Sequence, residues 1–69
     1  MDRTPVSSTN LRSIGYDPDA CTLEIEFNSG GVYQYAGVPQ AEYDGLMSAA
    51  SHGVYFNANI KKRYPETKM

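Results

Sequence analysis

The sequence predicts an α+β domain in which a three-stranded antiparallel β-meander is followed by two short helices packed on one face. Apolar and polar residues alternate over residues 21–27, which is the pattern of a half-buried strand. Over residues 43–50, apolar side chains recur at i, i+3, i+4 and i+7, which is one face of an amphipathic helix. This change of period along a chain of 69 residues indicates one small mixed domain.

The expected elements follow one another simply along the chain. Residues 1–9 are polar and rich in Ser and Thr, and we expect them to form a flexible N-terminal arm. The first strand is predicted over LRSIGYD, and the residues around Pro18 form a turn before the second strand, at 21–27. The segment NSGG supplies the next turn, and VYQYAGV is predicted to be the third strand.

Two helices are predicted after the strands. Pro39 suits the first turn of a helix, which is expected to end around residues 51–53. The segment VYFNANIKKRY carries Phe56 and Ile60 at helical spacing and is expected to form a short second helix, stopped by Pro65. The single domain is therefore expected to end there.

Size and composition limit the classes of function. One domain is expected over residues 10–65, followed by a tail at 66–69, and so short a chain has a thin stability margin. A single cysteine and a single histidine exclude a disulfide framework and a zinc cluster, so we expect no metal and no cofactor. The net charge of −2 leaves only a local basic patch for nucleic acid. The absence of a signal peptide or a membrane-spanning run predicts a cytoplasmic protein.

The NSGG turn allows two registers for the second hairpin. A loop of two or four residues places Tyr33 and Tyr35 on the face of the sheet that carries Glu24 and Glu26. The rings would then be exposed, but surrounded by carboxylates that repel phosphates. In the alternative register, described next, the rings belong to the core, so neither register favours an RNA-binding sheet of the usual aromatic kind.

A three-residue loop over 29–31, with its last glycine in the left-handed conformation, instead pairs Phe27 with Tyr33 and Ile25 with Tyr35. We favour this register because every apolar side chain of the hairpin then lies on one face. The side chains expected to face water are Glu24, Glu26 and Gln34. The helices would cover the apolar face, and the predicted core there comprises Tyr33, Tyr35, Phe27, Ile25, Leu23, Leu46, Phe56 and Ile60.

The first hairpin agrees with this assignment of faces. A loop over residues 17–20 places Tyr16 opposite Cys21 and Ile14 opposite Leu23. Cys21 is therefore expected to be a buried small hydrophobe rather than a reactive thiol.

The segments IGYD, LEIEF, YQY and GVYFNANIKKRYP, in this order and spacing, resemble the KTSC domain family. The Tyr-x-Tyr signature of that family is matched by Tyr33 and Tyr35, and its aromatic-Asn step by Phe56-Asn57. The resemblance covers roughly residues 8–65. The family occurs at the C-terminus of some lysyl-tRNA synthetases and as small bacterial and phage proteins. The resemblance thus suggests RNA binding and brings no catalytic residues.

A basic cluster over Lys61, Lys62 and Arg63 admits two interpretations. Cations at a helix C-terminus complement the helix dipole and keep the surface soluble. Alternatively, the cluster, extended by Arg12, contacts phosphates without sequence preference. Our leading hypothesis is a non-catalytic binding module that contacts RNA or another polyanion weakly through a basic C-terminal helix.

The second hypothesis is a protein-interaction or oligomeric module, or one that captures a small nucleotide, with no nucleic-acid role. Tyr55 lies off the apolar stripe of the second helix and is expected to be exposed, as interface tyrosines often are. Asn57 is a poor helix-interior residue, and it is a candidate for either structural hydrogen bonds or ligand contact. His52 and Ser51 are adjacent and cannot easily form a nucleophile–base pair, so we expect no enzyme.

Overall fold

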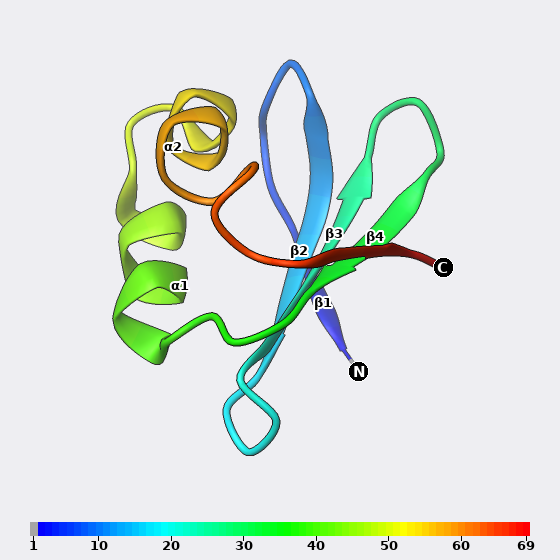
Figure 1. The fold of residues 1–69 in the computed structure, drawn as a ribbon. Coiled ribbons are helices and arrows are strands. Elements are labelled where there is room, and N and C mark those ends of the chain that lie inside the picture. Colours follow the sequence, from blue (N-terminus) through cyan, green and yellow to red (C-terminus); the bar gives the residue numbers. More distant parts are fainter. Residues whose placement is uncertain (1) are drawn as a thin grey trace.

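The computed structural model describes residues 2–69 and contains a five-stranded antiparallel sheet with two helices on one of its faces (Figure 1). The strands follow the order β1-β2-β3-β4-β5 across the sheet. The α+β class is confirmed, whereas the predicted number of three strands is wrong. In chain order the elements are β1 (Arg3–Pro5), β2 (Leu11–Asp17), β3 (Thr22–Phe27), β4 (Val32–Tyr35), α1 (Gln40–Ser48), α2 (His52–Asn59) and β5 (Glu66–Lys68).

The two additional strands lie in segments that were expected to be an arm and a tail. Within the expected arm, of which Met1 lies outside the described residues, β1 pairs with β2 and places Thr4 opposite Ile14. In the tail, β5 pairs with β4 and places Thr67 opposite Gln34. Both strands are short and exposed, without apolar alternation. They are stabilised by pairing with the rest of the sheet, which their own sequence does not indicate.

The β3–β4 hairpin has the predicted faces but a pairing shifted by two residues. Ile25 lies opposite Tyr33, and Leu23 lies opposite Tyr35. Because side chains alternate with a period of two, a shift of two residues leaves both tyrosines on the apolar face.

The shift arises from the position of the turn. The loop spans residues 28–30 rather than 29–31, and Gly30, with φ 102°, takes the left-handed conformation that was expected of Gly31. The Gly30 N–H donates to the Phe27 carbonyl (2.9 Å), and the Phe27 N–H donates to the Gly31 carbonyl (2.9 Å). The turn is thus of the expected kind, displaced by one residue.

The first hairpin is likewise displaced from its predicted register. Tyr16 pairs with Leu23 and Ile14 pairs with Ile25, so the predicted faces are kept. Cys21 lies in the turn with φ 51° and is exposed, so the expectation that it is buried is wrong. The last pair of the hairpin is Asp17 with Thr22, so the loop spans residues 18–21 instead of 17–20 and Cys21 lies outside the ladder.

The core lies between the sheet and the helices. Most of the predicted core is buried, but Phe27 and Tyr33 are half-buried and pack at its margin. The fully or nearly fully buried apolar residues are Leu11, Ile14, Leu23, Ile25, Tyr35, Val38, Leu46, Phe56 and Ile60.

The polar face of the sheet differs from the prediction at Glu24, which is buried rather than facing water. Arg3 of β1 lies across this face, where its guanidinium pairs with the Glu24 carboxylate and its Nε donates to Ser13 Oγ (3.0 Å). Gln34 Nε2 donates to Glu24 Oε1 (2.9 Å). These bonds, chiefly that from Gln34, hold the pKa of Glu24 below its usual value. The burial of Glu24 depends on Arg3 of β1, a strand that the sequence did not indicate.

The two helices are shorter than predicted. The side chain of Ser51 caps α2 by accepting from the Val54 N–H (3.3 Å), so α2 begins directly at His52. His52 Nδ1 lies 2.8 Å from the Leu46 carbonyl oxygen and joins the two helices. Because α2 ends at Asn59, the basic cluster lies in the turn after the helix and not in a helix.

Tyr55 is half-buried rather than exposed, because its ring packs over Gly45 of α1. A Cβ added at Gly45 would lie 2.8 Å from Tyr55 Cζ and closer still to the hydroxyl oxygen. The Tyr55 hydroxyl donates to Glu42 Oε1 (2.5 Å), and the Tyr64 hydroxyl donates to Oε2 of the same carboxylate (3.2 Å). Tyr55 therefore joins the two helices.

We expect Gly45→Ala to lower the free energy of unfolding by about 1 kcal/mol, because overpacking against Tyr55 outweighs the gain in helix propensity. In a Tyr55→Ala background the same substitution should instead raise it by about 1 kcal/mol, the propensity gain alone. Urea denaturation of the four proteins measures both values. A stabilising Gly45→Ala in the otherwise unchanged chain would contradict this packing.

Candidate functional site

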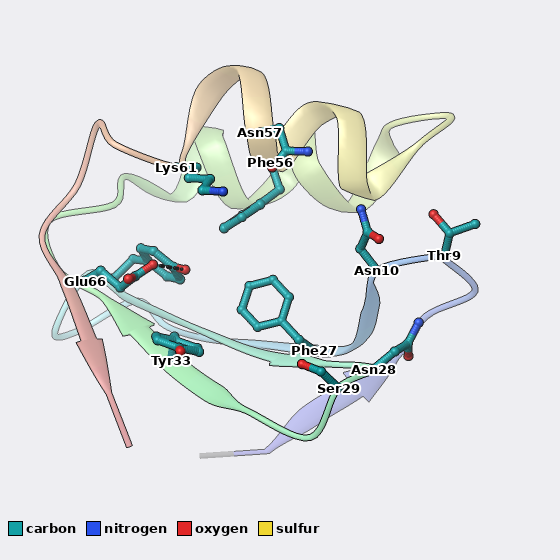
Figure 2. Close-up of a pocket in the computed structure, with 11 residues that line it drawn as sticks. Thr9, Asn10, Phe27, Asn28, Ser29, Tyr33, Phe56, Asn57, Lys61 and Glu66 are labelled. Atoms are coloured by element: carbon teal, nitrogen blue, oxygen red, sulfur yellow. Dashed lines mark hydrogen bonds between the residues drawn. The ribbon is translucent and has the colours of Figure 1, made fainter.

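A cleft of about 660 Å³ opens between the apolar face of the sheet and α2 (Figure 2). This volume lies within the range of about 300–1,000 Å³ that is typical of ligand pockets. Aromatic rings form its floor, two asparagines form a wall at one end, and a lysine and a glutamate stand at the other end.

The aromatic floor consists of Phe27 of β3 and Tyr33 of β4, and Phe56 extends toward it from α2. The Phe27 ring meets both neighbours edge to face, with its centroid 5.6 Å from that of Tyr33 and 5.5 Å from that of Phe56. Gly31 leaves room for Tyr33, since a Cβ there would lie 3.1 Å from the ring. Phe27 and Tyr33 are half-buried and present ring surface to the cleft. The prediction that both signature tyrosines belong to the core is therefore wrong for Tyr33.

The amide wall consists of Asn10, which precedes β2, and Asn28, in the β3–β4 turn. The Asn28 N–H donates to the Asn10 carbonyl (2.8 Å), and Asn28 Nδ2 donates to the Ser8 carbonyl (3.1 Å). Gly53 in the first turn of α2 lets Asn10 approach closely, because a Cβ there would lie 3.2 Å from Asn10 Nδ2. The wall thus places two side-chain amides at one end of the floor.

The charged end consists of Lys61, just after α2, and Glu66 of β5. The Tyr35 hydroxyl donates to Glu66 Oε1 (2.7 Å), the bond drawn as a dashed line in Figure 2. Burial, and then the hydrogen bond to Glu66, raise the pKa of Tyr35. The hydroxyl therefore stays protonated at neutral pH and orients the carboxylate.

The structure brings together only part of the predicted site. Lys61 and Asn57 line the cleft, whereas Lys62 and Arg63 are exposed and do not line it. Arg12 lines a separate groove beside β1. The predicted extension of the basic cluster by Arg12 is therefore not formed around the cleft.

Sequence reasoning missed the amide wall and Glu66. The register of β2 against β3, with Leu11 opposite Phe27, places Asn10 beside Asn28, so a correct hairpin alignment could have revealed the wall. Glu66 reaches the cleft because β5 pairs with β4, and the short strand gave no signal.

Two negative findings concern residues 2–69. No helix in this range is long and apolar enough to cross a membrane. No group of three or more His, Cys, Asp or Glu side chains there could hold a metal ion.

Comparison with known proteins decides the family. The model of the KTSC domain matches residues 7–64 of this chain. The chain belongs to the KTSC domain family. A crystal structure of a KTSC domain protein from Yersinia pestis superimposes with a TM-score of 0.97 at 47% identity, covering 99% of this chain and 96% of that one. The resemblance seen in the sequence is confirmed.

The chain is similar to relatives of two kinds. An uncharacterized protein of Stutzerimonas stutzeri (strain A1501) is 42% identical over 64 residues, which is 93% of this chain and 90% of that protein. A lysine–tRNA ligase of Nostoc punctiforme is 39% identical over 54 residues, which is 78% of this chain and 10% of the ligase. In this KTSC domain the two signature tyrosines differ, because Tyr35 is buried whereas Tyr33 lines the cleft.

Proposed function

We propose that this KTSC domain is a non-catalytic binding module for single-stranded RNA that holds an unpaired base in the cleft. The observation that carries the proposal is the cleft itself, whose aromatic floor offers the ring surfaces of Phe27 and Tyr33 beneath a polar rim. Stacking of a base on an aromatic ring is worth about 1–3 kcal/mol, and proteins read RNA chiefly at unstacked bases.

The polar rim suits the rest of a nucleotide. Lys61 stands at the mouth of the cleft and would contact a phosphate, and the amides of Asn10 and Asn57 can donate to and accept from a base or ribose. With a net charge of −2, the protein should bind weakly and only through such local contacts. The domain found in lysine–tRNA ligases supports RNA as the ligand, and the cytoplasm as the place where it is met.

A free nucleotide is the second candidate ligand. It carries the same base and phosphate, and a cleft of about 660 Å³ can accommodate it. The hypothesis of a protein interface has lost the exposed Tyr55 that motivated it.

Lys61→Gln is expected to weaken the binding of fluorescently labelled tRNA and to reduce the slope of log K against log salt by about 0.7, the value for one single-strand phosphate contact. The matched control is Lys62→Gln, which removes the same charge one residue away but outside the cleft lining, and should change the slope less. Competition by unlabelled mononucleotides would separate the two candidate ligands.

Three outcomes would contradict the proposal. Binding could be undetectable at low salt, or indifferent to salt. The two variants could also lose equal affinity, which would mean that the cluster acts through general charge and the cleft is not occupied.

A further inference from the structure

Glu66 is the only carboxylate among the described residues that line the cleft. A carboxylate repels the phosphates that the proposed RNA ligand carries, so it weakens binding unless it meets a donor. Ionised carboxylates only accept hydrogen bonds. The position of Glu66 thus points to a part of the ligand rich in N–H donors.

The surroundings of Glu66 orient it toward the aromatic floor. β5 places Glu66 opposite Tyr35, and the Tyr35 hydroxyl holds its Oε1 at 2.7 Å. No hydrogen bond from another residue in the range 2–69 reaches its Oε2. In Figure 2 Glu66 and Tyr33 lie at the same end of the cleft, with Lys61 on the side of α2, and Glu66 pairs with Tyr35, two positions from Tyr33 along β4. A base stacked on Tyr33 would therefore present an edge to Glu66.

Resting on the proposed function, we propose that Glu66 recognises the Watson–Crick edge of the bound base and makes the cleft selective for guanine. Guanine presents two adjacent donors there, N1–H and the N2 amino group, which match the two oxygens of a carboxylate. Adenine and cytosine present one amino donor beside an acceptor nitrogen, and uracil presents one imino donor between two carbonyls. Each of these three bases would set an acceptor against the Glu66 carboxylate, which disfavours it.

The preference should be large enough to measure with mononucleotides. The loss of one hydrogen bond to a charged group is expected to weaken binding by about tenfold or more. We expect the full chain to bind guanosine monophosphate about tenfold more tightly than the adenosine, cytidine or uridine monophosphates. Inosine monophosphate, which lacks the N2 amino group, should bind with intermediate affinity.

The test is a calorimetric or fluorescence titration of these five nucleotides against the unchanged protein, Glu66→Gln and Thr67→Ala. Glu66→Gln keeps an oxygen for the Tyr35 bond but introduces donors, so the guanine preference should fall to about threefold or less. Thr67→Ala changes the neighbouring position in β5, outside the cleft lining, and should keep the preference. Circular dichroism verifies that both variants are folded.

The outcomes separate this inference from the proposed function. Equal binding of all five nucleotides, tighter binding of another base, or an unchanged preference in folded Glu66→Gln would each overturn the inference and leave the cleft as an RNA site. If neither nucleotides nor tRNA bind, both proposals are wrong.

Discussion

Phe56→Ala is expected to lower the free energy of unfolding by about 3–5 kcal/mol, enough to unfold much of the protein. Phe56 is 4% exposed, and its ring contacts Phe27 and Tyr35 edge to face at 5.5 and 5.4 Å. It therefore packs α2 against the sheet. A domain of this size buries too little surface to tolerate such a cavity. Urea denaturation followed by circular dichroism measures the loss.

Val54→Ala is the matched control for this prediction. It lies on the same helix but is 68% exposed, so its truncation should change the free energy of unfolding by about 0.5 kcal/mol or less. If Phe56→Ala cost no more than Val54→Ala, Phe56 would not pack α2 against the sheet.

Tyr33→Ala is expected to weaken RNA binding by about 5- to 150-fold, which corresponds to the loss of one stacking interaction of about 1–3 kcal/mol. The ring is half-buried and forms part of the cleft floor, so its removal takes away stacking surface. Titration of labelled tRNA at low salt measures the change in affinity.

Tyr33→Phe separates the ring from its hydroxyl. Because stacking uses the ring, this variant should bind within about twofold of the unchanged protein. Folded Tyr33→Ala that binds RNA normally would show that the cleft floor takes no part in binding.

The faces of the sheet could be predicted from the sequence, but the position of its central turn could not. Glu24 and Glu26 alternate with Leu23, Ile25 and Phe27, so only one assignment keeps the glutamates out of the apolar face. Gly30 and Gly31 are adjacent, and either can adopt a left-handed conformation. In the structure Gly30 adopts it, and Gly31 leaves space for the Tyr33 ring.

The edge strands were beyond prediction because their stability comes from their neighbours. β1 and β5 are exposed segments without an apolar pattern, and each forms by pairing with a longer strand. Missing β1 concealed the burial of Glu24 under Arg3. Missing β5 concealed the approach of Glu66 to the cleft.

The candidate site was predictable only in part. Lys61 and Asn57 were identified from residue type, and both line the cleft. Tyr33 was assigned to the core because it was predicted to lie on the apolar face of the sheet. The buried fraction of its side chain also depends on how much of that face α2 covers, which the sequence does not show. The amide wall required a pairing between distant segments, which places Asn10 beside Asn28.

The most direct test of the central claim is an amide NMR titration of isotope-labelled protein with a short single-stranded RNA. We expect the largest shifts at the side-chain amides of Asn10, Asn28 and Asn57 and at the backbone amides of Tyr33 and Lys61, because these surround the cleft. Shifts confined to the groove that contains Arg12 and Glu26, on the opposite face of the sheet, would contradict the account. A spectrum that RNA leaves unchanged would contradict it equally.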